Sequence, residues 1–180
     1  NVTVAGSWVS SASTPGYLGA NYLHDNDADK GTKSVTFTPY IPVTGNYEVF
    51  LRWTSGSNRA PSVPVEINHA GGTANTTVNQ QSGGGVWQPI GLHAFNAGNG
   101  GSIVISNTGT SGYVIADAVR LVPSAGLPAG WVNEDVGPVG LAGSATHTGG
   151  VFTVNGSGAT IGSTADSFQF VRQTLTGDCT

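Results

Sequence analysis

Charged residues are scarce in this sequence of 180 residues, and basic ones are the scarcest. Charged side chains make up 9% of the chain, against about 25% in a typical soluble domain. Six lysines and arginines stand against ten aspartates and glutamates, which is too few to follow a nucleic-acid backbone. No apolar run approaches the roughly 20 residues of a membrane helix. We therefore expect neither nucleic acid nor a membrane as a partner.

Cysteine and the motifs of common enzymes are also nearly absent. Cys179 is the single cysteine, so no internal disulfide can form; an intermolecular bridge, a free thiol or a thiol without a role stay open. GxSxG, HExxH and P-loop patterns are missing. Glu48 and Glu66 could form a glycosidase pair, but each alternates with apolar residues, so we expect both to face solvent on one sheet. The sequence predicts no catalytic residue and no cofactor.

Glycine and neutral polar residues are abundant instead. The chain has 28 glycines, and serine, threonine and asparagine recur throughout. With 38% hydrophobic residues and a formal charge of −4, it lacks the low hydrophobicity and high charge of disordered chains. A neutral, hydroxyl-rich surface is typical of extracellular bacterial β-proteins, so we expect a secreted protein or part of one. No signal-peptide pattern is present, which favours a mature or excised segment.

Period-two alternation of apolar residues dominates the first two thirds of the chain. Residues 47–53 place Tyr47, Val49, Leu51 and Trp53 on one face, the pattern of a half-buried strand. Similar alternation occurs at residues 34–38, 63–68, 102–106 and 113–122, with Gly- and Pro-rich turns between them. Many short strands separated by frequent turns predict an all-β protein, a sandwich or a jelly roll.

A change in composition predicts a domain boundary. Residues 123–130 are rich in proline, glycine and alanine, which is typical of a linker. Beyond them, residues 145–154 predict a hairpin and residues 167–175 one more strand. So few strands bury too little apolar surface to stand alone. The segment 131–180 could pack on the first domain, be completed by strands of another chain, or continue in a longer polypeptide.

Several motifs within residues 1–122 occur in a distinctive order. They are Gly6-Ser7-Trp8, Thr14-Pro15-Gly16-Tyr17, Asn21-Tyr22-Leu23-His24-Asp25, Gly45-Asn46-Tyr47-Glu48-Val49, Asn58-Arg59-Ala60, Asn68-His69-Ala70-Gly71-Gly72 and Gly112-Tyr113-Val114-Ile115-Ala116-Asp117. In these motifs the chain resembles the golvesin C-terminal-like domain, also described as a xanthan lyase carbohydrate-binding-like domain. The resemblance implies a jelly-roll sandwich attached to secreted bacterial enzymes or surface proteins, which binds carbohydrate or adheres without chemistry of its own.

Residues 127–180 resemble the start of a second family. The run Leu127-Pro128-Ala129-Gly130-Trp131 and the run from Phe152 to Ala159 are similar to a concanavalin-like sandwich of secreted bacterial proteins. That family is much longer than this segment, and Cys179 stands where a glycine is expected. The resemblance implies a partial β-sandwich segment, and both ends of the chain look cut.

Planar polar side chains and aromatic rings form the expected sugar-binding set, because sugar hydroxyls pair with the former and pyranose faces stack on the latter. Trp53 and Tyr113 could be rings of the site or core residues, whereas Trp87 follows three glycines and is expected to be partly exposed. The predicted ligand-binding residues are Tyr22, His24, Asp25, Arg59, Asn68, His69 and Trp87.

Two acidic features leave alternatives open. Asp25, Asp27 and Asp29 alternate, so they could wrap a calcium ion or belong to a solvated loop; the EF-hand pattern fails, and we predict no metal. Asp117 lies within an apolar strand and needs a partner, for which Arg52, Arg59 and His24 are available. We predict a structural polar network of Asp117 with Arg52, with the floor of a ligand site as the alternative.

Two functions from different classes fit these observations. The first is a non-catalytic, extracellular carbohydrate-binding or adhesive module of a larger secreted bacterial protein, whose partner is a polysaccharide or a surface glycan. The second is a structural protomer of an extracellular filament or assembly, joined to copies of itself by strand exchange through residues 127–180, because unfinished sheets have open edges.

Overall fold

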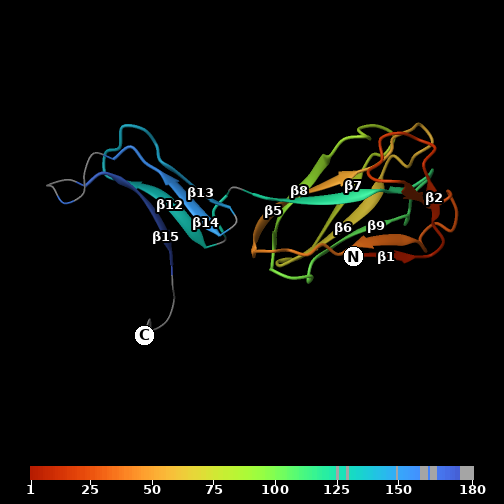
Figure 1. Cartoon of the computed structure of the whole chain (residues 1–180), viewed down its shortest axis with the longest axis horizontal. Helices are drawn as coiled ribbons and strands as arrows, with labels where there is room; N and C mark the ends of the chain where they lie inside the picture. The colour runs from red at the N-terminus through yellow and green to blue at the C-terminus, as the bar shows by residue number, and fades with distance from the viewer. Residues whose placement is uncertain (125, 129, 149, 159–161, 163–165, 175–180) are drawn as a thin grey trace. The chain divides into compact units, whose positions relative to one another are not determined.

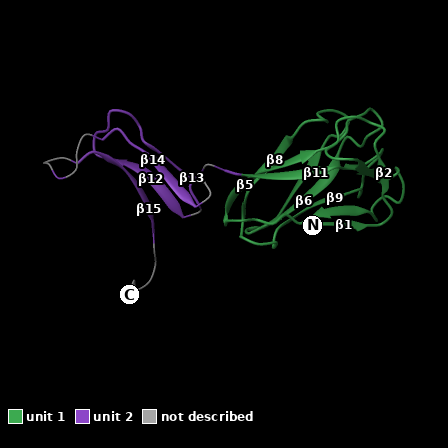
Figure 2. Ribbon diagram, viewed as in Figure 1, with its two compact units in different colours: residues 1–122 green, residues 123–180 purple. Residues whose placement is uncertain are grey.

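The computed structural model describes the chain except for residues 125, 129, 149, 159–161, 163–165 and 175–180. The chain divides into two compact units, Asn1–Val122 and Pro123–Thr180 (Figure 2). All regular elements in the described residues are strands, so the all-β prediction is confirmed. No helix of the described part is long and apolar enough to cross a membrane. Cys179 lies outside the described residues.

Eleven strands build the first unit (Figure 1). A five-stranded sheet in the order β1-β4-β9-β6-β7 forms one layer, and two three-stranded sheets, β10-β3-β2 and β11-β5-β8, complete the sandwich. The strands are β1 (Val2–Ala5), β2 (Val9–Ser11), β3 (Tyr22–His24), β4 (Ser34–Phe37), β5 (Gly45–Arg52), β6 (Val63–His69), β7 (Gly72–Val78), β8 (Gln88–Phe95), β9 (Ser102–Ser106), β10 (Ile115–Ala116) and β11 (Ala118–Pro123).

The core lies between the layers and follows the alternation of the sequence. On β5, Tyr47, Val49 and Leu51 are buried while Glu48 between them is exposed. In the five-stranded layer, β6 contributes Val63, Val65 and Ile67 and β9 contributes Ile103 and Ile105, and further core side chains come from the other strands and the loops. Burial of each large apolar side chain contributes about 1.5–3 kcal/mol, which gives this unit a continuous core.

The acid pair considered above as a glycosidase pair is not assembled. Glu48 and Glu66 are both exposed, as expected. They lie on β5 and β6, however, which belong to different sheets. The expectation that they share one sheet is therefore wrong, because β5 and β6 are consecutive strands that cross from one layer of the sandwich to the other.

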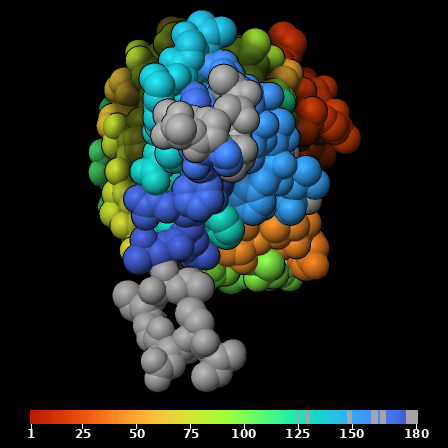
Figure 3. Space-filling model, turned by 90° about the vertical axis from the view of Figure 1, so that its left-hand side faces the viewer, coloured from red at the N-terminus to blue at the C-terminus, as the bar shows by residue number. Residues whose placement is uncertain are grey.

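The second unit consists of two two-stranded antiparallel sheets. β12 (Trp131–Val136) pairs with β15 (Phe168–Gln173), and β13 (Ser144–Thr148) pairs with β14 (Val151–Asn155) in the hairpin that the sequence predicts. Large apolar side chains of this unit remain exposed, including Leu141 at 75% and Val151 at 64%. Residues of this unit have blue tones in Figure 3. Its similarity to a concanavalin-like sandwich stays a prediction.

Candidate functional site

A polar pocket of about 600 Å³ lies where loops of the first unit meet. Tyr22 and His24 enter it from the same face of β3, since they stand two residues apart on a strand. The other lining residues come from the loop before β3, the loop after β5 and the loop between β9 and β10. They are Ser13, Thr14, Ser55, Gly56, Ser57, Asn58, Arg59 and Tyr113.

Backbone hydrogen bonds join the two loops that carry Arg59 and Tyr113. The amide of Tyr113 donates to the carbonyl of Asn58 at 3.0 Å, and the amide of Ala60 donates to the carbonyl of Tyr113 at 2.9 Å. Gly112 has a positive φ of 85°, and an added Cβ there would meet the carbonyl oxygen of Asn58 at 2.8 Å. This close approach requires glycine and fixes Arg59 beside Tyr113.

Aromatic rings form one side of the pocket. The rings of Tyr22 and His24 lie 6.2 Å apart, and those of His24 and Tyr113 meet edge to face at 5.5 Å. Tyr113 is half-buried, so the interpretation as a core residue is incomplete: it packs on the core and also lines the pocket. Trp53 is 4% exposed and belongs to the core.

The guanidinium group of Arg59 lies at the pocket with 8% of the residue exposed. Its Nη1 donates to the side-chain oxygen of Asn58 at 2.9 Å, and its Nη2 donates to the hydroxyl of Thr14 at 3.1 Å. Its Nε donates to the carbonyl of Thr54 at 3.4 Å. All three acceptors are uncharged.

The charge of Arg59 influences both titratable rings of the pocket. Burial alone would raise the pKa of Tyr22, but hydrogen bonds from neighbouring hydroxyl groups and the positive charge of Arg59 outweigh it and lower the pKa to about 8. Burial and the same charge lower the pKa of His24. The Nδ1 of His24 accepts a hydrogen bond from the amide of Asn26 at 3.1 Å. The imidazole is therefore neutral at pH 7, with its proton on Nε2.

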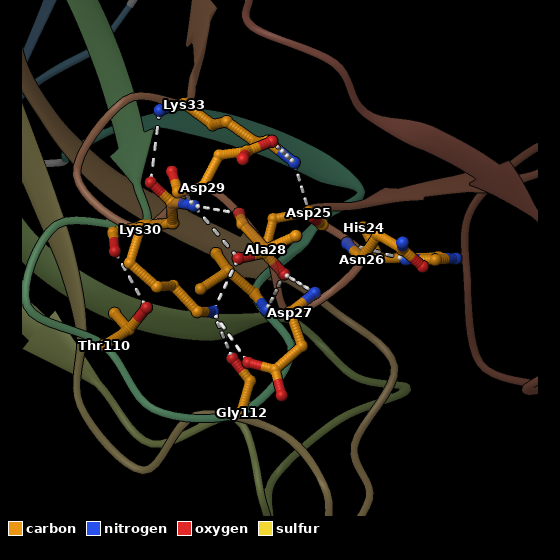
Figure 4. A network of polar contacts seen from close by, with 12 residues as sticks. His24, Asp25, Asn26, Asp27, Ala28, Asp29, Lys30, Lys33, Thr110 and Gly112 are labelled. Carbon is orange, nitrogen blue, oxygen red and sulfur yellow. Dashed lines mark hydrogen bonds and ion pairs between the residues drawn. The ribbon is translucent and has the colours of Figure 1, made fainter.

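Asp25, which the sequence predicts to bind the ligand, does not line this pocket. Its side chain is fully buried and points away from the face of His24 into a polar network (Figure 4). It accepts hydrogen bonds from Lys30 Nζ at 2.7 Å, from the amide of Val114 at 2.9 Å and from Asn107 at 3.1 Å. Burial alone would raise the pKa of Asp25, but these hydrogen bonds lower it.

Lysine side chains also occupy the acidic loop. The interpretation as a solvated loop holds for Asp27 and Asp29, whose side chains are 44% and 67% exposed, but not for the buried Asp25. Lys30 Nζ lies 3.0 Å from a carboxylate oxygen of Asp27 as well, and Lys33 Nζ lies 3.2 Å from Asp29. Two ammonium groups thus take the places that a calcium ion would need. Among the described residues no group of three acids, histidines or cysteines could hold a metal.

Asp117 pairs with Arg52, as the sequence predicts, and lies outside the polar pocket. The Nε of Arg52 is 4.0 Å from the carboxylate of Asp117, which also accepts hydrogen bonds from the amide of Leu18 at 3.0 and 3.1 Å. Burial raises the pKa of Asp117. The residue borders a separate cavity of about 220 Å³ with mostly apolar lining. These contacts favour the structural role.

Asn68, His69 and Trp87 do not line the pocket. Asn68 bonds with Ser102 and Thr73 on the surface of the five-stranded sheet. The ring of His69 lies 4.7 Å from that of His93. Trp87 is half-buried, in line with the expected partial exposure, and stacks on Arg120 at 4.8 Å. The predicted site therefore divides, and only Tyr22, His24 and Arg59 come together.

Sequence reasoning did not include the hydroxyl groups of the pocket. Ser13, Thr14, Ser55 and Ser57 line it, but serine and threonine occur throughout the chain and carry no distinctive spacing. The signal that could have found them is their position: Thr14 precedes the Pro15-Gly16 turn, and the three residues 55–57 stand directly before Asn58-Arg59.

The fold and the pocket together define a class, a β-sandwich module with a polar, ring-lined site in its loops. The chain belongs to the golvesin C-terminal domain family, whose model matches residues 1–123.

A curated relative and two solved structures extend this result. A xanthan lyase of Bacillus sp. (strain GL1) is 52% identical over 124 residues, which is 67% of this chain and 13% of the relative. A Paenibacillus xanthan lyase structure is 50% identical with a TM-score of 0.68, over 68% of this chain and 12% of that one. A family 35 carbohydrate binding module from Clostridium thermocellum has a TM-score of 0.51 at 16% identity, over 68% and 92% of the two chains. The last likeness shows the fold alone, and the chain spans about an eighth of the xanthan lyases.

Proposed function

We propose that the first unit is a non-catalytic carbohydrate-binding or adhesive module, which binds a polysaccharide or surface glycan in the pocket between β3 and the loops after β5 and β9. The observation that carries the proposal is the composition of this pocket. It combines three rings, several hydroxyl groups and the planar side chains of Asn58 and Arg59. Sugar recognition needs this combination of a few placed polar groups and apolar ring faces.

The carboxylates considered for catalysis are not arranged as a pair in the described part of the chain. Glu48 and Glu66, the carboxylates considered for glycosidic chemistry, are exposed on different sheets. A glycosidase needs two carboxyl groups on either side of the scissile bond. Asp25 and Asp117, the two acids with fully buried side chains, are engaged by Lys30 and Arg52.

The kind of larger protein to which this module belongs is proposed from its relatives. The chain matches only a small share of two bacterial xanthan lyases, which supports an accessory module of a larger, secreted protein acting on polysaccharides. The alternative, a protomer of an extracellular filament, has no support from the relatives.

Binding to a panel of neutral and acidic polysaccharides, measured by affinity electrophoresis and calorimetry with the full chain, tests the proposal. We expect retention by at least one polysaccharide, and roughly tenfold weaker binding for Tyr113→Ala, because one ring–ligand contact contributes about 0.5–1.5 kcal/mol.

Trp87→Ala is the matched control, since Trp87 is a half-buried ring outside the pocket, and its binding should not change. The proposal fails if the folded protein binds no polysaccharide at millimolar sugar. The site assignment fails if Trp87→Ala abolishes binding and Tyr113→Ala does not.

A further inference from the structure

The cations of this chain are almost all neutralised by acids. The sequence has six lysines and arginines. Four of them form ion pairs with carboxylates at 4.0 Å or less: Lys30, Lys33, Arg52 and Arg172. A fifth, Arg120, is exposed and stacks on Phe50 and Trp87 at 4.5 and 4.8 Å. Arg59 is the remaining cation; unlike the first four it has no carboxylate partner among the described residues, and unlike Arg120 it is buried.

Arg59 is the buried cation for which the described residues supply no carboxylate. Its three hydrogen-bond acceptors are the neutral oxygens of Thr54, Asn58 and Thr14. A guanidinium group has five N–H donors, so one N–H on each terminal nitrogen has no acceptor in the described part of the protein. These two donors belong to a side chain that lines the pocket.

The pocket itself carries no compensating charge. None of the described residues that line it is acidic, and its neighbours Tyr22 and His24 are neutral at pH 7 for the reasons given above. A buried charge without a partner costs several kcal/mol. Because the whole chain has a formal charge of −4, the positive charge at Arg59 is a local property of the pocket and not a general attraction for anions.

We propose that this pocket binds an acidic sugar residue. The anionic group of that sugar, a carboxylate or a sulfate ester, accepts hydrogen bonds from the two N–H groups of Arg59 that have no other acceptor among the described residues. A planar guanidinium binds such oxygens in pairs, which adds both strength and direction. The phenol of Tyr22 and the Nε2–H of His24 supply further donors on the same side of the pocket. This inference rests on the proposed carbohydrate-binding function and specifies the class of its ligand.

Pairs of polysaccharides that differ only in the charged group test the inference without any variant. Calorimetry of the full chain with polygalacturonate and with its methyl ester isolates the carboxylate, and κ-carrageenan against chemically desulfated κ-carrageenan isolates the sulfate ester. We expect about tenfold or stronger preference for at least one acidic partner, because a hydrogen bond to a charged group contributes about 1.5–3 kcal/mol. The pair that shows the preference identifies the anionic group.

Variants then assign the preference to Arg59. Arg59→Lys keeps the positive charge but loses the paired N–H donors of the guanidinium group, and Arg59→Ala loses both. Affinity for the acidic polysaccharide should therefore fall in Arg59→Lys and fall further in Arg59→Ala. Arg120→Ala removes the other arginine without an acid partner and should change nothing, with circular dichroism confirming that each variant is folded.

The outcomes separate the two proposals. Equal binding of the charged and uncharged members of both pairs overturns the acidic-sugar inference and leaves the carbohydrate-binding function standing. No binding to any polysaccharide overturns both. An acidic preference that Arg120→Ala abolishes and Arg59→Lys leaves intact overturns the assignment to this pocket.

Discussion

At the scale of single residues, two neighbours in the sequence have opposite roles. His24 faces the pocket and Asp25 is buried in the ion-pair network on the other side of the same strand end. We expect Asp25→Asn to destabilise the protein by about 3 kcal/mol, because it leaves the ammonium of Lys30 without its buried partner. Urea unfolding measures this change.

Asp27→Asn is the matched control for this substitution, because Asp27 also pairs with Lys30 but is 44% exposed. Its loss should cost less than about 1 kcal/mol. Asp27 has φ 50°, a left-handed conformation that asparagine also tolerates. Equal effects of the two substitutions would contradict the central role of Asp25.

The pKa of Asp25 also predicts a pH dependence of stability. Hydrogen bonds lower this pKa in the folded state, so the contribution is complete above the unfolded value of about 4 and is lost as the pH falls through the folded pKa. Unfolding free energies of the wild type should therefore decrease more steeply below about pH 4 than those of Asp25→Asn. Parallel curves would argue against this linkage.

Tyr22 should make ligand binding sensitive to alkaline pH. Its pKa of about 8 means that a phenolate forms beside Arg59 above this pH and competes with an anionic ligand. The hydroxyl of Tyr22 forms a hydrogen bond with the hydroxyl of Ser13, and the rings of Tyr17 and His24 lie beside the Tyr22 ring. Affinity for an acidic polysaccharide should fall between pH 7 and 9 in the wild type and stay flat in Tyr22→Phe, as calorimetry can measure.

The sequence predicted only part of the candidate site, because local sequence patterns do not show which distant residues the fold brings together. Arg59 and His69 were both predicted to bind the ligand, but Arg59 precedes β6 and His69 is its last residue. A seven-residue strand separates its ends by about 20 Å, so one pocket cannot contain both. The burial of Asp25 depends on Asn107 and Val114, contacts about 80 residues away that local spacing does not reveal.

At the scale of elements, the period-two alternation of apolar residues predicted the main strands and their buried faces. It did not predict which strands pair with each other. β4 pairs with β9 and β5 with β8, and these partners are set by crossovers between the layers. The jelly-roll order therefore came from the family resemblance and not from periodicity.

The loop between β9 and β10 provides a prediction at this scale. In Gly112→Ala the added Cβ would meet backbone atoms of Asn58 and Arg59 at 2.8 to 3.1 Å. The two loops must then separate, so we expect weaker polysaccharide binding together with a loss of stability of about 2 kcal/mol, from strain and displacement. Calorimetric binding and thermal unfolding measure the two effects.

Gly109→Ala is the control in the same loop. Gly109 also has a positive φ, 67°, but an added Cβ there meets nothing within 4 Å. It should cost only the roughly 1 kcal/mol of left-handed backbone strain and leave binding intact. If both substitutions reduced binding equally, the close approach at Gly112 would not be what positions Arg59.

At the scale of the whole molecule, the two units differ in how completely they bury their apolar residues. Residues 1–123 contain one continuous core, whereas β14 is exposed along its whole length. We expect a truncated chain of residues 1–123 to unfold cooperatively and to bind as the full chain does. Scanning calorimetry and the binding assay check this, and an unfolded truncated chain would contradict it.

The ion-pair network also has a practical consequence for covalent labelling. The chain has two lysines, and both ammonium groups are engaged: Lys30, with a side chain 26% exposed, also donates to the carbonyl of Gly112 at 2.6 Å, whereas Lys33 is only 4% exposed. Amine-acylating reagents should therefore react with Lys33 only when the loop opens, and with Lys30 more readily. Mass-spectrometric footprinting of the two lysines would thus report how often that opening occurs, with the amino terminus as an internal reference.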